Sequence, residues 1–132
     1  MTYKTTLENG VRVICEKMEG IRSVTIGIWV RAGSAMETAQ QNGISHFIEH
    51  MMFKGTEKRT YKQIAAEIDN VGGQSNAFTS KECTCYYVKL IDEEQSLAAD
   101  ILCDMISNSV FDESEMKKEK GVVLEEIAMS ND

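Results

Sequence analysis

The chain has 132 residues, about the size of one ordinary domain. Its formal net charge of −7 argues against nucleic acid as a partner, because nucleic-acid-binding proteins need a basic surface. No apolar run approaches the roughly 20 residues of a membrane helix, and the first residues lack the apolar stretch of a signal peptide. We therefore expect a cytoplasmic protein that neither binds nucleic acid nor crosses a membrane.

The first part of the chain is predicted to form three strands. Residues 3–7 and 11–17 are strand-like, and Asn9-Gly10 between them is a strong hairpin signal. Residues 23–31 alternate in polarity, so that one side of this strand carries Val24, Ile26, Ile28 and Val30.

Two helices and two further strands are predicted next. The first helix covers roughly residues 43–53. The second is opened by a capping box of Thr60 and Gln63 and ends at Gly72-Gly73. Strand-like runs follow at residues 74–79 and 83–91.

Asp92 and Asp112 are predicted to cap the last two helices, the second of which runs to about Met129. Strands and helices are therefore grouped along the chain and do not alternate. This order predicts an α+β fold with an antiparallel or mixed sheet and helices packed on one face.

Both histidines of the chain lie in the first predicted helix, in the sequence His46-Phe47-Ile48-Glu49-His50. Positions four apart share one face of a helix, so the two imidazoles can grip one metal ion. This is the H-x-x-E-H pattern, which places a glutamate beside the metal as a general base. A pair of structural histidines is the alternative, but the apolar residues of this helix cluster on another side.

A catalytic zinc ion takes three protein ligands, so the two histidines need a carboxylate or a cysteine to join them. In the last helix, Glu119 and Glu126 fall within the arc of the apolar residues, whereas Glu125 falls outside it. That apolar arc, which we expect to face inward, consists of Met116, Val122, Val123 and Ile127. Cys103 is a poorer ligand, because it lies on the polar side of its own helix.

The helical wheel leaves a second interpretation of these two glutamates open. Glu119 and Glu126 can instead lie at the margin of the apolar stripe, reach water, and pair with Lys120 or Arg59. A buried carboxylate is costly unless a cation or a hydrogen-bond donor meets it. The two interpretations therefore differ in whether a metal ion supplies the positive charge.

The segment from His46 to Thr56 resembles the zinc motif of the pitrilysin and mitochondrial processing peptidase family. Among its branches, the short bacterial processing proteases are the most similar. Residues 30–37, 72–87 and 119–127 resemble three other characteristic blocks of that family, so the resemblance covers nearly the whole chain.

The resemblance implies a zinc-dependent endopeptidase that acts on unfolded peptides. Zn²⁺ would be held by His46, His50 and Glu126, with Glu49 as general base and Glu119 as a supporting acid. The peptide substrate would add as a strand along Asn76, Ala77, Phe78 and Thr79, a binding mode that edge strands allow.

Family members consist of two homologous halves. Residues 1–132 are expected to be most of the first half, a zinc-binding peptidase domain whose partners are the missing second half or a second copy of the chain.

Two other functions remain in competition. A lyase of the S-ribosylhomocysteine type also carries H-x-x-E-H but takes a cysteine as third ligand. Some family members are non-catalytic assembly subunits, although these have lost the motif, which is intact here.

Overall fold

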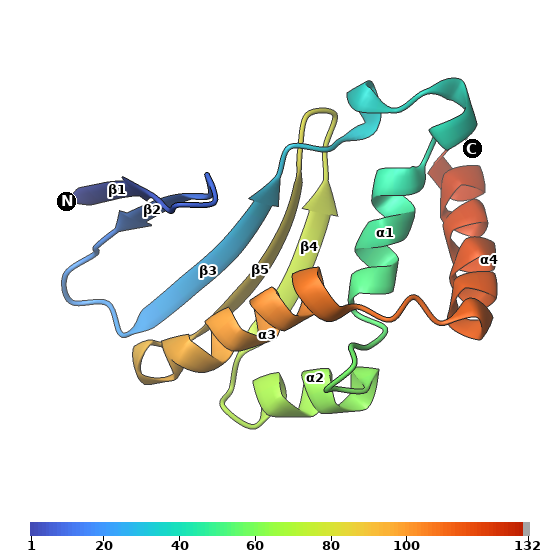
Figure 1. Ribbon diagram of the computed structural model, residues 1–132. Helices are drawn as coiled ribbons and strands as arrows, with labels where there is room; N and C mark the ends of the chain where they lie inside the picture. Colours follow the sequence, from blue (N-terminus) through green and yellow to red (C-terminus); the bar gives the residue numbers. More distant parts are fainter. Residues whose placement is uncertain (131–132) are drawn as a thin grey trace.

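The computed structural model describes residues 1–130 of the chain. It begins with an antiparallel hairpin of β1 (Thr2–Thr6) and β2 (Arg12–Glu16), whose residues are all exposed. The predicted turn is confirmed: the Val11 amide donates to Asn9 Oδ1 at 3.1 Å, and Gly10 has a φ of +87° that favours glycine. The hairpin lies to one side of the rest of the fold (Figure 1).

The main sheet has three strands, β3 (Ser23–Val30), β4 (Gln74–Thr79) and β5 (Thr84–Ile91). Their order is β3-β5-β4, and both pairings are antiparallel. The pairing of Ile28 with Tyr86, and of Tyr86 with Ala77, places these three side chains on one face. The predicted α+β class is therefore correct, and the sheet is antiparallel.

Four α-helices follow the strands in two groups: α1 (Ile44–Met52), α2 (Tyr61–Asp69), α3 (Gln95–Asn108) and α4 (Glu113–Ser130). Helix α3 runs across β3 and β5, and α1 lies beside β4 (Figure 1). The predicted capping box of α2 is present, since Thr60 and Gln63 exchange hydrogen bonds between side chain and backbone. Asp112 Oδ1 likewise accepts from the Glu115 amide at the start of α4.

The hydrophobic core lies between the sheet and α1, α2 and α3. Its buried residues come from all three helices and from the central strand: Met52, Ile64, Ile68, Tyr86, Val88, Leu90, Ala98, Ile101, Leu102 and Met105. Helix α3 supplies the last four of them. Each large side chain buried here stabilises the fold by about 1.5–3 kcal/mol.

The opposite face of the sheet is open, as the prediction of helices on one face requires. It carries Trp29 on β3 and Phe78 on β4, whose rings meet edge to face with centroids 5.5 Å apart. Trp29 is among the exposed large side chains, whereas Cys85 beside it on β5 is buried.

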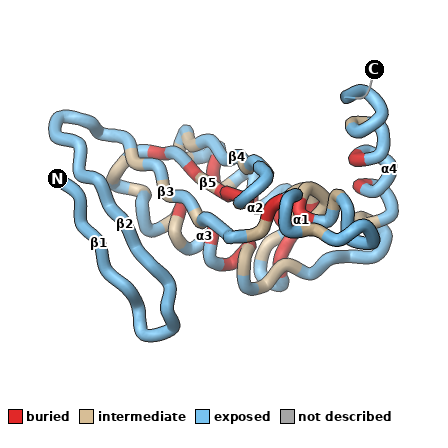
Figure 2. The backbone as a smooth tube through the Cα atoms, turned by 90° about the horizontal axis from the view of Figure 1, so that it is seen from above, coloured by how far each residue is buried: buried red, intermediate tan, exposed pale blue. Residues whose placement is uncertain are grey.

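Helix α4 is the least covered helix. It packs against α1 and projects from the end of the molecule, as the tube in Figure 2 shows. The prediction of its inward face is therefore only partly right: Val123 is buried and Met116 half-buried, but Val122 and Ile127 are exposed. Its apolar stripe is wider than the surface that α1 offers.

The prediction that Asp92 caps α3 is wrong. A short 3₁₀ turn, Asp92–Glu94, precedes α3, and the side chain of Asp92 accepts hydrogen bonds from Arg22 at the start of the sheet. The guanidinium of Arg22 holds the pKa of Asp92 below its usual value. An ion pair between two chain segments replaced a local cap here.

Within residues 1–130, no helix combines the length and the apolarity that a membrane crossing requires.

Candidate metal centre

The N-terminus of α1 is held in place by the segment that follows β3. Gly33 packs against the turn between β4 and β5 so closely that a Cβ there would lie 2.5 Å from the carbonyl oxygens of Ser80 and Lys81. Glu37 then accepts hydrogen bonds from the amides of Gly43 and Ser45 at 3.0 and 2.8 Å. The Ser45 hydrogen bond lowers the pKa of Glu37, so this carboxylate caps α1 in its ionised form.

His46 and His50 lie one turn apart on α1, as the motif predicts. Their Nε2 atoms are 3.1 Å apart, and their rings meet edge to face with centroids 4.7 Å apart. Neither histidine belongs to the hydrophobic core, which agrees with the wheel. Both rings therefore direct a ligand atom toward one point beside the helix.

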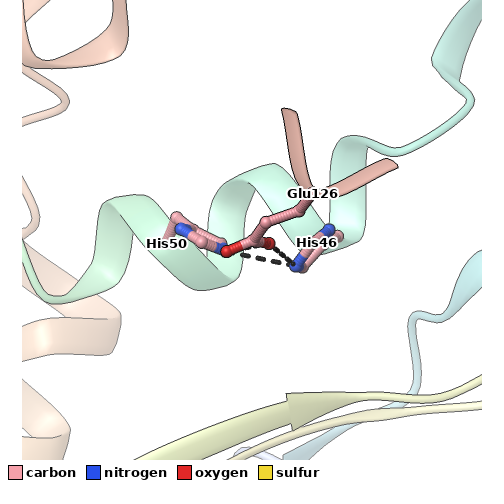
Figure 3. A group of neighbouring side chains, drawn as sticks. All are labelled: His46, His50 and Glu126. Carbon is pink, nitrogen blue, oxygen red and sulfur yellow. Dashed lines mark hydrogen bonds and ion pairs between the residues drawn. The ribbon is translucent and has the colours of Figure 1, made fainter. Parts of the chain in front are cut away.

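Glu126 reaches that same point from α4. Its Oε2 lies 3.3 Å from His46 Nε2 and 3.4 Å from His50 Nε2 (Figure 3). Among residues 1–130, these three side chains form the group of histidine, cysteine or acidic residues whose ligand atoms lie close enough together to hold a metal ion. Glu125 is exposed, and Cys103 is exposed on α3 outside this group.

The three ligand atoms form a triangle with sides of 3.1, 3.3 and 3.4 Å. Tetrahedral Zn²⁺ with bonds near 2.0–2.1 Å separates its ligands by about 3.3–3.4 Å. The triangle thus has the size of one face of a zinc coordination tetrahedron. Two imidazoles and a carboxylate are also a ligand set that catalytic zinc sites use.

A single cation at the centre of this triangle would meet all three ligand atoms at once. Without a metal ion, the same contacts are hydrogen bonds whose direction depends on which ring nitrogens carry protons. The spacing and the chemistry of the three side chains therefore fit a metal ion.

Glu119, two turns before Glu126 on α4, contacts the rear of the centre. Its side chain is only 9% exposed; Oε2 lies 2.9 Å from His50 Nδ1, and Oε1 lies 2.7 Å from Lys54 Nζ. Burial alone would raise the pKa of Glu119, but its hydrogen bonds with Lys54 and His50 outweigh burial and lower it. An ionised carboxylate only accepts, so His50 Nδ1 donates the hydrogen bond to Glu119 and its Nε2 side faces His46 and Glu126.

Glu49, the glutamate of the motif, contacts the sheet. Thr79 Oγ1 on β4 donates a hydrogen bond to the Glu49 carboxylate. Tyr86 on β5 is buried nearby, and burial together with the charge of Glu49 raises the pKa of Tyr86 to about 12. Thr79 was predicted only as part of a peptide-binding strand, and strand alternation turns its side chain to the helix face.

The four residues predicted to bind peptide divide between the two faces of β4. Ala77 and Thr79 share the face of Tyr86, whereas Asn76 and Phe78 lie on the open face. The Ala77 amide donates to Asn76 Oδ1 at 2.8 Å. Within residues 1–130, β4 is an edge strand, since β5 is its one paired neighbour.

Sequence reasoning missed two residues of this region. Lys54 follows the motif helix and pairs with Glu119, and Glu37 caps α1; neither contact has a short-range pattern that would reveal it. Arg59, one of the two alternative partners, pairs with Glu67, Asp100 and Asp104 instead of with Glu119 or Glu126.

Comparison with known proteins identifies the family of the chain. Residues 12–132 match the insulinase family, peptidase family M16. The chain is 54% identical over 132 residues to the uncharacterized zinc protease YmxG of Bacillus subtilis. The matched region is all of this chain and 32% of that protein. It is 46% identical over 126 residues to mitochondrial-processing peptidase subunit beta of Rattus norvegicus. This matched region is 96% of this chain and 26% of the relative.

The fold has a close counterpart among solved structures. A protease from Helicobacter pylori superposes with a TM-score of 0.91 at 27% sequence identity, over 96% of this chain and 30% of that one. The chain thus spans about a third or less of the proteins that it resembles. Because residues 12–132 match this family, the chain belongs to the insulinase family, peptidase family M16.

Proposed function

We propose that this chain carries the zinc centre of a metalloendopeptidase, with residues 1–132 as its zinc-binding domain. The observation that carries the proposal is the triangle of His46, His50 and Glu126, whose sides match a face of a zinc tetrahedron. The names of the relatives, zinc protease and mitochondrial-processing peptidase, support both the metal and the reaction. Activity of the whole protein is part of the proposal.

Each residue of the centre has a separate role. His46, His50 and Glu126 would hold Zn²⁺, and Glu119 would orient His50 through Nδ1. Bound zinc would supply a Lewis acid that activates water and polarises the scissile carbonyl. Glu49 would take a proton from the attacking water and deliver it to the leaving amine, as a general base and then a general acid.

The contact between Thr79 and Glu49 supports a position for the substrate. Thr79 lies at the end of β4, and its hydroxyl holds the base on the side of the sheet. A peptide that added to the β4 edge along Asn76–Thr79 would lie beside Glu49. Binding through the main chain suits unfolded peptides of varied sequence, because such hydrogen bonds do not depend on side chains.

Glu49→Gln in the full-length protein tests the role of the base. We expect peptide hydrolysis to fall by about 10²–10⁴-fold, the usual contribution of a general base, while zinc content stays at the wild-type level. Zinc is measured by metal analysis and hydrolysis with an unfolded peptide substrate. Glu57→Gln, which changes an exposed acid just after the same motif, is the matched control. Unchanged hydrolysis in zinc-loaded Glu49→Gln would contradict the role.

Metal analysis also separates the peptidase from the lyase. We expect Glu126→Gln to lose zinc and Cys103→Ser to keep it, because Cys103 lies outside the triangle. Glu125→Gln, the adjacent exposed acid, should behave like wild type. Loss of zinc in the cysteine variant alone would favour the lyase.

A further inference from the structure

Lys54 is a charged residue that the proposed mechanism does not use. It follows Phe53, the residue just after α1, and its side chain is about two-thirds buried. Its Nζ lies 2.7 Å from Glu119 Oε1, while His50 Nδ1 lies 2.9 Å from the other oxygen of the same carboxylate. Both oxygens of Glu119 are thus held, one by Lys54 and one by His50.

The same carboxylate holds α4 in place. Among the described residues of α4, only Glu119 and Val123 are buried. The helix packs against α1 and otherwise extends into solvent (Figure 2). Glu119, which pairs with Lys54, is thus one of the two buried residues that hold α4 on the fold, and Glu126 lies two turns further along the same helix face.

We propose that Lys54 is a positioning residue of the metal centre: by pairing with Glu119 it fixes the orientation of the His50 ring and the position of α4, and so of Glu126. The inference rests on the proposed zinc site. Lys54 itself does not touch the triangle of ligand atoms.

Removal of Lys54 changes the centre through Glu119. The carboxylate would keep His50 as a donor but lose its counter-charge, and a buried unpaired charge is costly. Glu119 would turn toward water, because this restores its solvation. His50 would then lose the acceptor that fixes its tautomer, and the first turns of α4 would move with Glu119.

Zinc affinity of the full-length protein tests the inference. Zinc dissociation constants are measured by competition with a chromophoric chelator for wild type, Lys54→Met and Lys54→Arg. We expect Lys54→Met to bind zinc about 10–100-fold more weakly, the usual effect of losing an outer-shell partner. Lys54→Arg keeps the charge and should retain most of the affinity. Lys54→Gln replaces the methionine variant if that variant does not fold.

Lys118→Met is the matched control. Lys118 lies on α4, is 70% exposed and pairs with Glu115, so its loss removes the same charge without touching the centre. An equal loss of affinity in Lys118→Met and Lys54→Met would overturn the inference, because it would reflect net charge alone. Wild-type affinity in Lys54→Met would also overturn it.

A second measurement does not require zinc. The ¹⁵N chemical shifts of the His50 ring report which nitrogen carries the proton. In zinc-free wild type we expect the proton on Nδ1, and in Lys54→Met a mixture of tautomers. An unchanged His50 tautomer would overturn the orienting role of Lys54.

The zinc dissociation constant of Glu126→Gln is measured in parallel. Wild-type zinc affinity in that variant would refute the zinc site itself, and the tautomer measurement would still decide the role of Lys54.

Discussion

The charged cluster around Arg59 and the triangle of His46, His50 and Glu126 differ in what supplies the positive charge. In the first, Arg59 donates to Glu67, Asp100 and Asp104 at 3.0, 2.6 and 2.9 Å. In the second, the Nε2 atoms of His46 and His50 and the Oε2 atom of Glu126 lie 3.1–3.4 Å from one another. The first cluster contains a permanent cation, the guanidinium, and the second consists of two imidazoles and a carboxylate, which are zinc ligands.

The Arg59 cluster is complete without any ligand. Asp104, whose side chain is 1% exposed, also accepts from Thr56 Oγ1 at 2.7 Å and from Asn108 Nδ2 at 2.8 Å. Every oxygen of this buried carboxylate therefore has a donor, as buried polar groups require. This cluster ties the segment after α1 to α3, and we assign it to stability.

The comparison shows how a metal site differs from a structural ion-pair network. Both gather acids and bases from separate elements, so composition does not distinguish them. The difference is whether the cluster contains a permanent cation or consists of ligand atoms that converge on one point. The ligand atoms of His46, His50 and Glu126 converge in this way, whereas the cluster around Arg59 contains a guanidinium.

The largest expected effect on stability is at Asp104. Asp104→Ala should lower the free energy of unfolding by about 3–5 kcal/mol, the usual cost of removing one partner of a buried ion pair. Urea denaturation measures it. Asp100→Ala, which removes an exposed partner of the same arginine, is the control and should cost less. If Asp104→Ala also abolished zinc binding in protein that remains folded, the two clusters would not be independent.

Zinc should stabilise the protein through the second cluster alone. At a free zinc concentration one hundred times the dissociation constant, the free energy of unfolding should rise by about 2.7 kcal/mol. Glu126→Gln should lose most of this increment, and Glu125→Gln and Asp100→Ala should keep it. The measurement is urea denaturation with zinc and with a chelator. An undiminished increment in Glu126→Gln would place the metal elsewhere.

The smallest expected effect is the acid dependence of the first cluster. Burial raises the pKa of Asp104, but hydrogen bonds from Thr56, Asn108 and Arg59 outweigh it, so its folded pKa lies below the usual value. A depressed pKa stabilises the fold above the unfolded-state pKa of about 3.9, and this stability is lost as the pH falls through the lower folded pKa.

Asp104→Asn should therefore flatten the acid side of the stability curve. Unfolding free energies are compared with wild type from neutral pH downward, with a chelator present so that the metal centre makes no contribution. Parallel curves for the two proteins would show that Asp104 is not the group responsible.

Most elements of the fold could be predicted because their signals are local. The turn at Gly10 and the capping box at Thr60 each depend on residues within a few positions of one another. Predictions failed where a distant partner decided the outcome. Asp92 pairs with Arg22 instead of capping α3, and Val122 is exposed because α1 covers only part of α4.

The candidate site likewise combines relations within one helix, which the sequence reveals, and contacts between helices, which it does not. His46 and His50 share a face because helix geometry places residues four apart together, and Glu119 and Glu126 share a face of α4 for the same kind of reason. These relations follow from the sequence once each helix is recognised.

Which atoms finally meet was decided by the tertiary structure. Three contacts join elements that are separate in the chain. Glu126 meets both histidines, Thr79 donates to Glu49, and Lys54 pairs with Glu119. The sequence alone determined the helices, the faces and the kind of chemistry, because these depend on local backbone geometry. The docking of α4 on α1 and of α1 on β4 depends on packing between distant segments, and only that packing brings the ligand atoms into a triangle.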